Sequence, residues 1–307
     1  IVSMFEDLQL SQIICIGTPR LHDYIRAHKN GEIKSLLMDI DDRFEPFYPN
    51  DFCHFNMFNH HFLDGAEGEA KLVNFLKSNH EDERSHHCIF VDPPFAARTE
   101  LLTVTLKRIF SLYYSLNHKH MPIFWVFPYF NESHIKKEMP EMEMLDFQVT
   151  YRDHYAFNQE YKGRKEGCPV RIFTNIDQSL ITYPSFLNNL YRFCQQCRRH
   201  VALKNNHCFV CKVCPSKNGS EYRHCDECIK CVKPSYFHCH PCGRCVQKSN
   251  HNCIIYQSHQ ECWGCNEKGH VENNCSRLKQ FKVKKGKCRI CNEKHNLKIC
   301  KNKFKYF

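Results

Sequence analysis

Long apolar runs are absent from this sequence. A membrane-spanning helix needs roughly 20 consecutive apolar residues, and the longest candidates are short pieces such as PIFWVFPYF at 122–130. No secretory signal peptide heads the chain, which begins at Ile1 and not at Met. We therefore expect a soluble protein with no membrane partner and with further residues upstream of Ile1. Its 307 residues, 42% of them hydrophobic, predict about two domains and at least one substantial core.

Cysteine is scarce in the first 190 residues, where it occurs four times, whereas the other 18 of the 22 cysteines crowd among histidines in the last third. Disulfides would suit a secreted module, but Cys-x2-Cys pairs interleaved with His favour zinc in a reducing compartment. Charge divides at the same boundary, because residues 191–307 contain 24 Lys and Arg against 7 Asp and Glu. A basic, metal-stiffened region predicts a nucleic-acid partner, although a basic run is otherwise usually a solvated face.

The first two-thirds of the chain alternates between strand-like and helix-like patterns. Runs of β-branched and aromatic residues predict strands at 11–17, 35–41, 51–58, 87–91, 122–127, 146–152 and 168–175. Apolar residues at helical spacing predict helices at 21–28, 68–78 and 97–117. We expect the last two strands to pair antiparallel. The alternation predicts a doubly wound, Rossmann-like α/β sheet, followed by a zinc-stabilised region with little regular secondary structure.

Ligands of such sheets bind beyond the carboxyl ends of the strands, so the residues that end the strands are the candidates. The first strand ends in a turn and a helix start at Gly17, Thr18, Pro19 and Arg20. The second ends at Asp39 and Asp41, where an acid commonly accepts hydrogen bonds from ribose hydroxyls. Another ends in the motif Asp92, Pro93, Pro94 and Phe95. One glycine is often only a turn and a terminal Asp often only a cap, but the ordered set indicates a site.

This order resembles the amino-methylating group of class I S-adenosylmethionine methyltransferases, which is marked by Asp/Asn-Pro-Pro followed by Phe, Tyr or Trp. The match covers about residues 10–175, and the turn CIGTPR at 15–20 lacks the usual Gly-x-Gly of that family. The resemblance implies S-adenosylmethionine as cofactor. Its contacts would come from the turn at 17–20, from Asp39 or Asp41, and from Asp92.

The Asp-Pro-Pro-Phe motif suits methylation of an amine whose lone pair is delocalised into a ring. The Asp92 carboxylate and the Pro93 carbonyl can accept the two N–H groups, which favours a lone pair directed at the methyl group. Proline fixes φ and thereby holds the carbonyl rigidly, and Phe95 can stack on a base that has left its stack. The simpler alternative is a strand-ending Asp-Pro turn with a core Phe.

Four Cys-x2-Cys pairs begin at 194, 211, 228 and 242, and each is followed by His and Cys. Twelve Cys and four His would make four Cys3His sites: Cys194, Cys197, His207, Cys208, Cys211, Cys214, His224, Cys225, Cys228, Cys231, His238, Cys239, Cys242, Cys245, His251 and Cys253. The pairing can be sequential, with Cys208 completing the first site, or interlocked, with Cys214. Residues 224–253 resemble the cysteine-rich domain of DHHC-type acyltransferases, in which interlocked pairing is the rule. Because Asn replaces two of the four DHHC residues at 250–253, the resemblance implies the zinc scaffold without acyl transfer.

The stretch CWGCNEKGHVENNC at 262–275 fits Cys-x2-Cys-x4-His-x4-Cys and resembles a zinc knuckle, with ligands Cys262, Cys265, His270 and Cys275. Knuckles bind unpaired bases by stacking and hydrogen bonds, and Trp263 is the aromatic residue placed for stacking. A second, shorter knuckle is predicted from Cys288, Cys291, His295 and Cys300. The predicted RNA contacts include the basic run with Lys282, Lys284 and Lys285. Together the spacings predict about six zinc ions.

The whole order resembles the animal family of CCHC-zinc-finger ribosomal RNA adenine-N6 methyltransferases. The resemblance implies methylation of an adenosine in large-subunit (28S) rRNA, in a stem-loop or single strand, and a nucleolar and cytoplasmic location. A lysine methyltransferase with the same motif, or a non-catalytic RNA-binding scaffold, are the alternatives. We predict a methyltransferase domain at 1–190, a multi-zinc region at 191–258, a knuckle at 259–277, and a second knuckle with a basic tail at 278–307. The sequence leaves the oligomeric state unknown.

Overall fold

A computed structural model describes residues 1–29, 31–77, 86–149, 168–247 and 251–253, and positions 262, 265, 267, 268, 270, 275 and 276. The chain divides into two compact units, Ile1–His224 and Cys225–Phe307. No helix in the described part of the chain combines the length and the apolar character that a membrane span needs.

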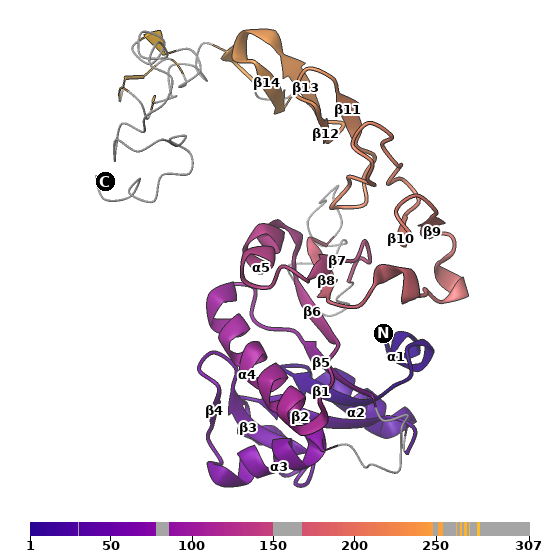
Figure 1. The fold of residues 1–307 in the computed structure, drawn as a ribbon, viewed down its shortest axis with the longest axis vertical. Coiled ribbons are helices and arrows are strands. Elements are labelled where there is room, and N and C mark those ends of the chain that lie inside the picture. The colour runs from indigo at the N-terminus through magenta and orange to yellow at the C-terminus, as the bar shows by residue number, and fades with distance from the viewer. Residues whose placement is uncertain are drawn as a thin grey trace. The chain divides into compact units, whose positions relative to one another are not determined.

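The first unit is built on a mixed sheet of eight strands in the order β4-β3-β2-β1-β5-β6-β8-β7 (Figure 1). The strands are β1 Leu10–Ile16, β2 Lys34–Asp39, β3 Phe52–Asn56, β4 His61–Phe62, β5 His86–Val91, β6 Ile123–Pro128, β7 Glu143–Met144 and β8 Val170–Thr174. The five central strands from β3 to β6 are parallel, while β4, on β3, and β8, on β6, run antiparallel to them. The predicted α/β, Rossmann-like sheet is confirmed.

Helices cover both faces of this sheet. They are α1 Val2–Asp7, α2 Pro19–His28, α3 Ala66–Leu76, α4 Thr99–Asn117 and α5 Glu132–Glu138. Side chains along β1 alternate between two buried clusters, because successive residues of a strand point to opposite faces: Ile14 packs with α3 and α4, whereas Ile13 packs with α1 and α2. The central strands are therefore buried on both faces, as their continuous apolar sequence predicts.

The edge of the sheet departs from the prediction at 146–152. The short strand β7 lies earlier, and both it and β8 pair antiparallel, as expected of the two closing strands. The β7–β8 pairing ends there because the chain next contacts the β9–β10 hairpin. The buried Asp146 carboxylate accepts hydrogen bonds from Ala202 N at 2.8 Å and Asn205 Nδ2 at 2.7 Å. Residues 150–152 lie outside the described residues.

In its described part, the cysteine-rich region contains small two-stranded sheets and little other regular structure, as predicted. Its strands are β9 Tyr191–Cys194 with β10 Arg199–Ala202, β11 Arg223–Cys225 with β12 Lys230–Val232, and β13 Tyr236–Cys239 with β14 Arg244–Gln247. The β9–β10 hairpin belongs to the first unit, and β13–β14 to the second.

Candidate active site and metal centres

The carboxyl ends of β1, β2 and β5 meet at one place on the edge of the sheet. Ile16 lies opposite Met38 on one side and Val91 on the other. Main-chain hydrogen bonds continue past the strands, from Gly17 N to Met38 O at 3.0 Å and from Asp92 N to Ile16 O at 3.2 Å. The strand order reverses between β2 and β5 around β1, which is the point where open α/β sheets bind ligands. Residues 17, 39 and 92 are thus brought together as predicted.

Gly17 is a position where only glycine fits. Its φ is +66°, and a β-carbon there would lie 2.9 Å from Met57 Cε and 3.1 Å from the Asp92 carbonyl oxygen. The turn after β1 therefore lies directly against the main chain of the Asp-Pro-Pro-Phe motif. Glycine is therefore required here by its positive φ and by the packing of Met57 and Asp92 against the turn. Met57 follows β3, and no signal in the sequence links it to this turn.

The other predicted residues of this turn lie at the start of α2. Thr18 is buried at the N-cap position but makes no capping hydrogen bond with its side chain. Pro19 occupies the first turn of the helix, where a missing N–H costs nothing. Arg20 is exposed. Because the turn is anchored by Gly17 and Pro19, the amino end of α2 is directed to the same edge of the sheet.

The two candidate ribose acids are in different electrostatic states. The Asp41 carboxylate is held by Arg43, with Oδ1 2.8 Å from Nε and Oδ2 2.5 Å from Nη2. These bonds lower the pKa of Asp41 to about 2. Asp39 is half-buried, and its Oδ1 accepts a hydrogen bond from Asp41 N at 3.0 Å. Burial raises the pKa of Asp39. Asp39 forms no ion pair among the described residues, whereas Asp41 is paired with Arg43, so Asp39 is the acid that better fits a ligand.

The Asp-Pro-Pro-Phe motif leaves the sheet as a tight turn. Pro94 O accepts a hydrogen bond from Ala97 N at 2.9 Å, whereas no described residue donates to Pro93 O. Pro93 is buried and Asp92 is half-buried. The Phe95 ring packs edge-to-face on Phe127, with centroids 6.4 Å apart and planes at 80°. The Pro93 carbonyl thus has no donor among the described residues, and the roles of Asp92, Pro93 and Phe95 stay predictions.

Cys168 is a neighbour of this site that sequence reasoning did not place there. It lies at the start of the segment that enters β8, whose first residue, Val170, is opposite Pro128 at the end of β6. Burial raises the pKa of the Cys168 thiol, and the negative charge of Asp92 adds to the effect. The antiparallel insertion of β8 beside β6 produces this proximity, and no local pattern around Cys168 announces it.

Three Cys and one His gather in each of several groups that can hold a metal ion. The first unit contains Cys194, Cys197, His207 and Cys214, and the second contains Cys225, Cys228, His238 and Cys245, then Cys239, Cys242, His251 and Cys253, then Cys262, Cys265, His270 and Cys275. The ligand atoms of each group lie within 4.8 Å of one another. In the first, His207 Nδ1 is 3.2 Å from Cys197 Sγ and 3.8 Å from Cys194 Sγ. A tetrahedral zinc site with bonds of about 2.0–2.3 Å has ligand separations of roughly 3.3–3.8 Å, so these groups fit zinc.

The ligand pairing is interlocked. Cys214, and not Cys208, joins the first Cys-x2-Cys pair, and Cys245 joins Cys225 and Cys228. Cys208 and Cys211 lie with His224, their sulfurs 3.6 and 3.3 Å from its Nδ1. The remaining predicted ligand of the repeat, Cys231, belongs to the second unit.

A backbone feature repeats with the ligands. The residue after Cys197, Cys211, Cys228 and Cys242, each the second Cys of a Cys-x2-Cys spacing within one metal group, has positive φ: Arg198 at 51°, Lys212 at 56°, Ile229 at 51° and Gly243 at 61°. This left-handed residue turns the chain back, so that main-chain N–H groups approach the sulfurs; Cys211 N, for example, donates to Cys208 Sγ at 3.4 Å. Three of the four positions are not glycine. The sequence therefore carries no obvious signal for these turns, and the metal geometry is what supports their strain.

The described part of the predicted knuckle is consistent with a metal site. Cys265 Sγ lies 3.3 Å from His270 Nε2, and Cys262 N donates to Glu267 O at 2.9 Å. Several predicted residues lie outside the described residues, namely Trp263, Lys282, Lys284 and Lys285 and the second knuckle with Cys288, Cys291, His295 and Cys300.

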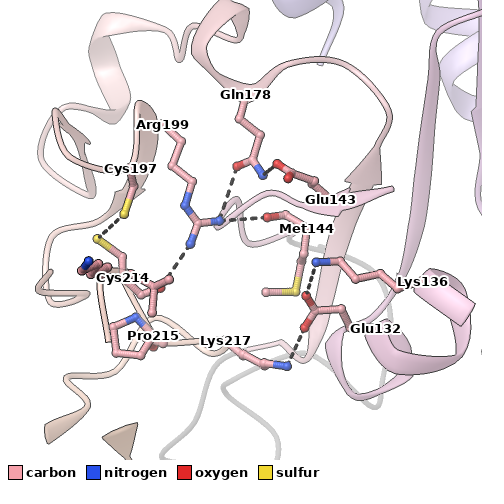
Figure 2. Close-up of a pocket in the computed structure, with 13 residues that line it drawn as sticks. Glu132, Lys136, Glu143, Met144, Gln178, Cys197, Arg199, Cys214, Pro215 and Lys217 are labelled. Atoms are coloured by element: carbon pink, nitrogen blue, oxygen red, sulfur yellow. Dashed lines mark hydrogen bonds and ion pairs between the residues drawn. The ribbon is translucent and has the colours of Figure 1, made fainter. Parts of the chain in front are cut away.

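The first metal group is joined to the sheet by a polar network within the first unit. Arg199 donates to Met144 O at 3.2 Å, to Gln178 Oε1 at 3.4 Å and to Cys214 O at 3.1 Å (Figure 2). Asp146 is 2% exposed, and burial raises its pKa, an effect opposed by the hydrogen bond from Asn205. A loss of the first metal group would therefore expose polar groups at the edge of the sheet.

Comparisons with known proteins agree with the geometry. The family model described as "Probable N6-adenine methyltransferase" matches residues 3–177. The chain is 41% identical over 288 residues to the rRNA N(6)-adenosine-methyltransferase ZCCHC4 of Homo sapiens, which covers 91% of this chain and 54% of that protein. It is also 41% identical over 218 residues to the protein of the same name from Bos taurus, covering 68% of this chain and 41% of that protein. The chain thus spans about half the length of the curated relatives it matches.

Proposed function

The chain belongs to the probable N6-adenine methyltransferase family, and from this we propose that it methylates N6 of an adenosine in ribosomal RNA, most specifically in the large-subunit (28S) RNA. The family membership agrees with the resemblance that the Asp-Pro-Pro-Phe motif indicates. The observation that carries the proposal is the convergence of Gly17, Asp39 and Asp92 at one switch point of the sheet. The relatives whose names specify rRNA N(6)-adenosine supply the substrate class.

The residues at the edge of the sheet divide into a cofactor part and a substrate part. S-adenosylmethionine, when bound, supplies a methyl group on a sulfonium sulfur. Gly17, Thr18, Pro19 and Arg20 would border the cofactor on the β1 side, and Asp39 would accept hydrogen bonds from its ribose. Asp41 has a different role, because its carboxylate is already bonded to Arg43.

Asp92 and Pro93 would orient the adenine amine. The carboxylate and the carbonyl each accept one N6–H, so that the nitrogen lone pair points at the methyl carbon. Bound S-adenosylmethionine would supply the methyl group, and the Asp92 carboxylate would lie beside the amine that loses one proton on methylation. Phe95, supported by Phe127, would stack on the adenine. Positioning and electrostatics would supply most of the acceleration.

The cysteine-rich region would hold about six zinc ions and capture the RNA. The proposal is supported by the four-ligand groups and by the excess of basic residues after position 190. Trp263 would stack on an unpaired base, and Lys282, Lys284 and Lys285 would contact phosphates. An rRNA substrate would place the protein in the nucleolus and the cytoplasm.

Incubation with labelled S-adenosylmethionine tests the proposal. We expect label in deproteinised large-subunit rRNA and at N6 of adenosine after digestion. Label in a ribosomal protein extract, with none in RNA, would favour lysine methylation. Label in neither substrate, with RNA binding retained, would favour a non-catalytic scaffold. The Cys262→Ser, Cys265→Ser double variant should weaken RNA capture while cofactor binding persists, because a knuckle folds only around its metal.

A further inference from the structure

A cavity of about 500 Å³ lies in the first unit between the end of the sheet and the β9–β10 hairpin. It is outside the residues assigned above to cofactor, catalysis and metal. Its walls include the ring of Tyr191 and the side chains of Leu187, Leu190 and Leu203. Leu190 is 53% exposed and Leu203 is 43% exposed. The two are held side by side, since Leu203 N donates to Leu190 O at 2.9 Å. A single exposed leucine is ordinary, but a group of apolar side chains lining one cavity indicates a binding surface.

Several polar groups of this cavity have no hydrogen-bond partner among the described residues, whereas the Tyr191 hydroxyl accepts a hydrogen bond from Gln148 N at 3.0 Å. The ammonium of Lys204 and the side-chain amides of Asn189 and Gln148 have no partner there. Asn218 uses its Oδ1 for Ser220, with the hydroxyl 2.7 Å away, and its Nδ2 has no partner in the described structure. Three amides and one cation beside an apolar wall are the groups that recognise a planar heterocycle attached to a phosphate.

A second cavity, of about 470 Å³, lies beside Arg199 (Figure 2). Several of its charged and polar side chains are paired with one another. Lys217 and Lys136 are both paired with Glu132, at 2.5 and 3.2 Å. Gln178 donates to Glu143 at 2.8 Å. The hydrogen-bonding and charged groups of these side chains are thus used by one another. We therefore assign the cavity beside Arg199 to the junction between the hairpin and the sheet. In the cavity beside Leu190, the described side chains of Lys204, Asn189 and Gln148 form no such network with one another, and they remain for a ligand.

The topology places the Leu190 cavity on the same edge of the sheet as Asp92. β7 runs parallel to β5 and β6, because both β6 and β7 pair antiparallel with β8. Residues that follow β7, among them Gln148, therefore lead towards the carboxyl edge. The pairing with β8 continues one residue beyond β7, because Leu145 N donates to Ile172 O. The lateral separation from β5 to β7 is three strand spacings, or about 14 Å, which a strand of RNA spans with a few nucleotides.

We propose that this cavity binds an unpaired base of the substrate RNA close in sequence to the target adenosine. The inference rests on the proposed function, because it assumes RNA as substrate. The base would pack against the three leucines, its edge would bond to the amides, and Lys204 would contact the adjoining phosphate. Loop RNA offers such splayed bases, whereas paired RNA does not. The cavity would thus select a loop around the methylated adenosine.

Two variants test the inference in the intact chain. Leu190→Glu places a carboxylate against the base, and Lys204→Gln removes the phosphate contact. With deproteinised large-subunit rRNA, each should raise the KM for RNA roughly tenfold, the scale of one stacked base, with unchanged kcat and S-adenosylmethionine affinity. Matched controls are Leu180→Glu, at a leucine that is 61% exposed elsewhere in the unit, and Lys107→Gln on α4. Both should keep the wild-type KM.

A crosslinking readout is independent of methylation. rRNA substituted with 4-thiouridine should crosslink to peptides that contain residues 187–191 or 202–204, and Leu190→Glu should reduce these adducts. The inference fails if both variants keep the wild-type KM and adducts form only elsewhere. If the wild-type protein methylates no RNA, the proposed function fails. The crosslinked adducts then test the base-binding cavity by themselves, and their absence from both peptides overturns it as well.

Discussion

The α-carbon of Gly17 faces the carbonyl group of Asp92 so closely that a β-carbon on residue 17 would lie 3.1 Å from the carbonyl oxygen. The turn that follows β1 and the motif that follows β5 are therefore in contact through their main chains. Cofactor and substrate parts of the site share this wall, so a change at residue 17 should affect both.

Gly17→Ala should abolish cofactor binding and methylation. The new methyl group meets Met57 Cε as well as Asp92 O, and φ of +66° is unfavourable for alanine by about 1 kcal/mol. Gly31→Ala is the matched control, since Gly31 has φ of +93° with no atom within 4 Å of a β-carbon. Calorimetric titration with S-adenosylmethionine should detect no binding to Gly17→Ala and normal binding to Gly31→Ala. Normal binding by both would remove the glycine turn from the cofactor site.

Asp39→Asn should weaken S-adenosylmethionine about tenfold or more, because loss of a charged acceptor costs roughly 1.5–3 kcal/mol. Asp41→Asn should change the affinity by less than about threefold and instead lower the thermal midpoint slightly, because its carboxylate is bonded to Arg43. Calorimetric titration with S-adenosylmethionine measures the affinity of both variants. The opposite ranking of the two variants would assign the ribose to Asp41.

Asp92→Ala should reduce kcat by at least about a hundredfold while RNA affinity stays within about twofold of wild type. The reason is that acceptors directed at the reacting amine matter mainly in the transition state. Single-turnover methylation at saturating rRNA and filter binding of the same RNA measure the two quantities. Normal turnover by Asp92→Ala would overturn the enzymatic proposal.

Cys214→Ser should remove one zinc ion from a total of about six and destabilise the first unit by several kcal/mol. Cys214 shares a group with Cys194 and Cys197, and its carbonyl accepts a bond from Arg199. The control is Cys53→Ser, because Cys53 is a buried thiol whose donor bond to Gly68 O a hydroxyl can replace. Elemental analysis and chemical denaturation provide the measurements. A full zinc content in Cys214→Ser would contradict the assignment of Cys214 as a zinc ligand.

His22 should make the stability of the first unit depend on pH. It is fully buried on α2, with Nδ1 2.8 Å from Ser35 Oγ, and burial lowers its pKa to about 4. In the unfolded chain the pKa is about 6.5, so the unfolded state binds the proton more tightly. Stability is therefore constant above about pH 6.5 and falls between pH 6.5 and 4, by about 2–3 kcal/mol.

The His22→Gln variant isolates this contribution. Denaturant unfolding at pH 7.5 and 4.5 should show a decline smaller than that of wild type by about 2–3 kcal/mol. The exposed His28→Gln variant should retain the wild-type decline. An equal decline in wild type and His22→Gln would show that His22 is protonated in the folded state or accessible to water.

The local sequence pattern determined much of the fold and of the candidate site of this protein. Apolar runs of strand length alternating with helical spacing are sufficient to predict the parallel core from β1 to β6, because burial on both faces requires such sequences. The Asp-Pro-Pro-Phe motif and the Cys and His ligands were equally accessible, since their chemistry depends on residue type and short spacing. The Cys-x2-Cys spacing is met both by Cys208 with Cys211 and by Cys211 with Cys214, so it leaves the local partner as well as the distant ligand open.

Tertiary structure decided which distant groups meet. Cys208 and Cys214 are both close enough along the chain to complete the first site, and the fold of the β9–β10 hairpin selects Cys214. Asp39 and Asp41 are two residues apart, and the orientation of Arg43 decides which carboxylate stays available. The strand expected at 146–152 ends early because Asp146 bonds to Asn205, which is 59 residues away. The Asp146 outcome depends on a contact between segments that are remote in the sequence, and the other two depend on side-chain geometry; periodicity and spacing contain no information about either.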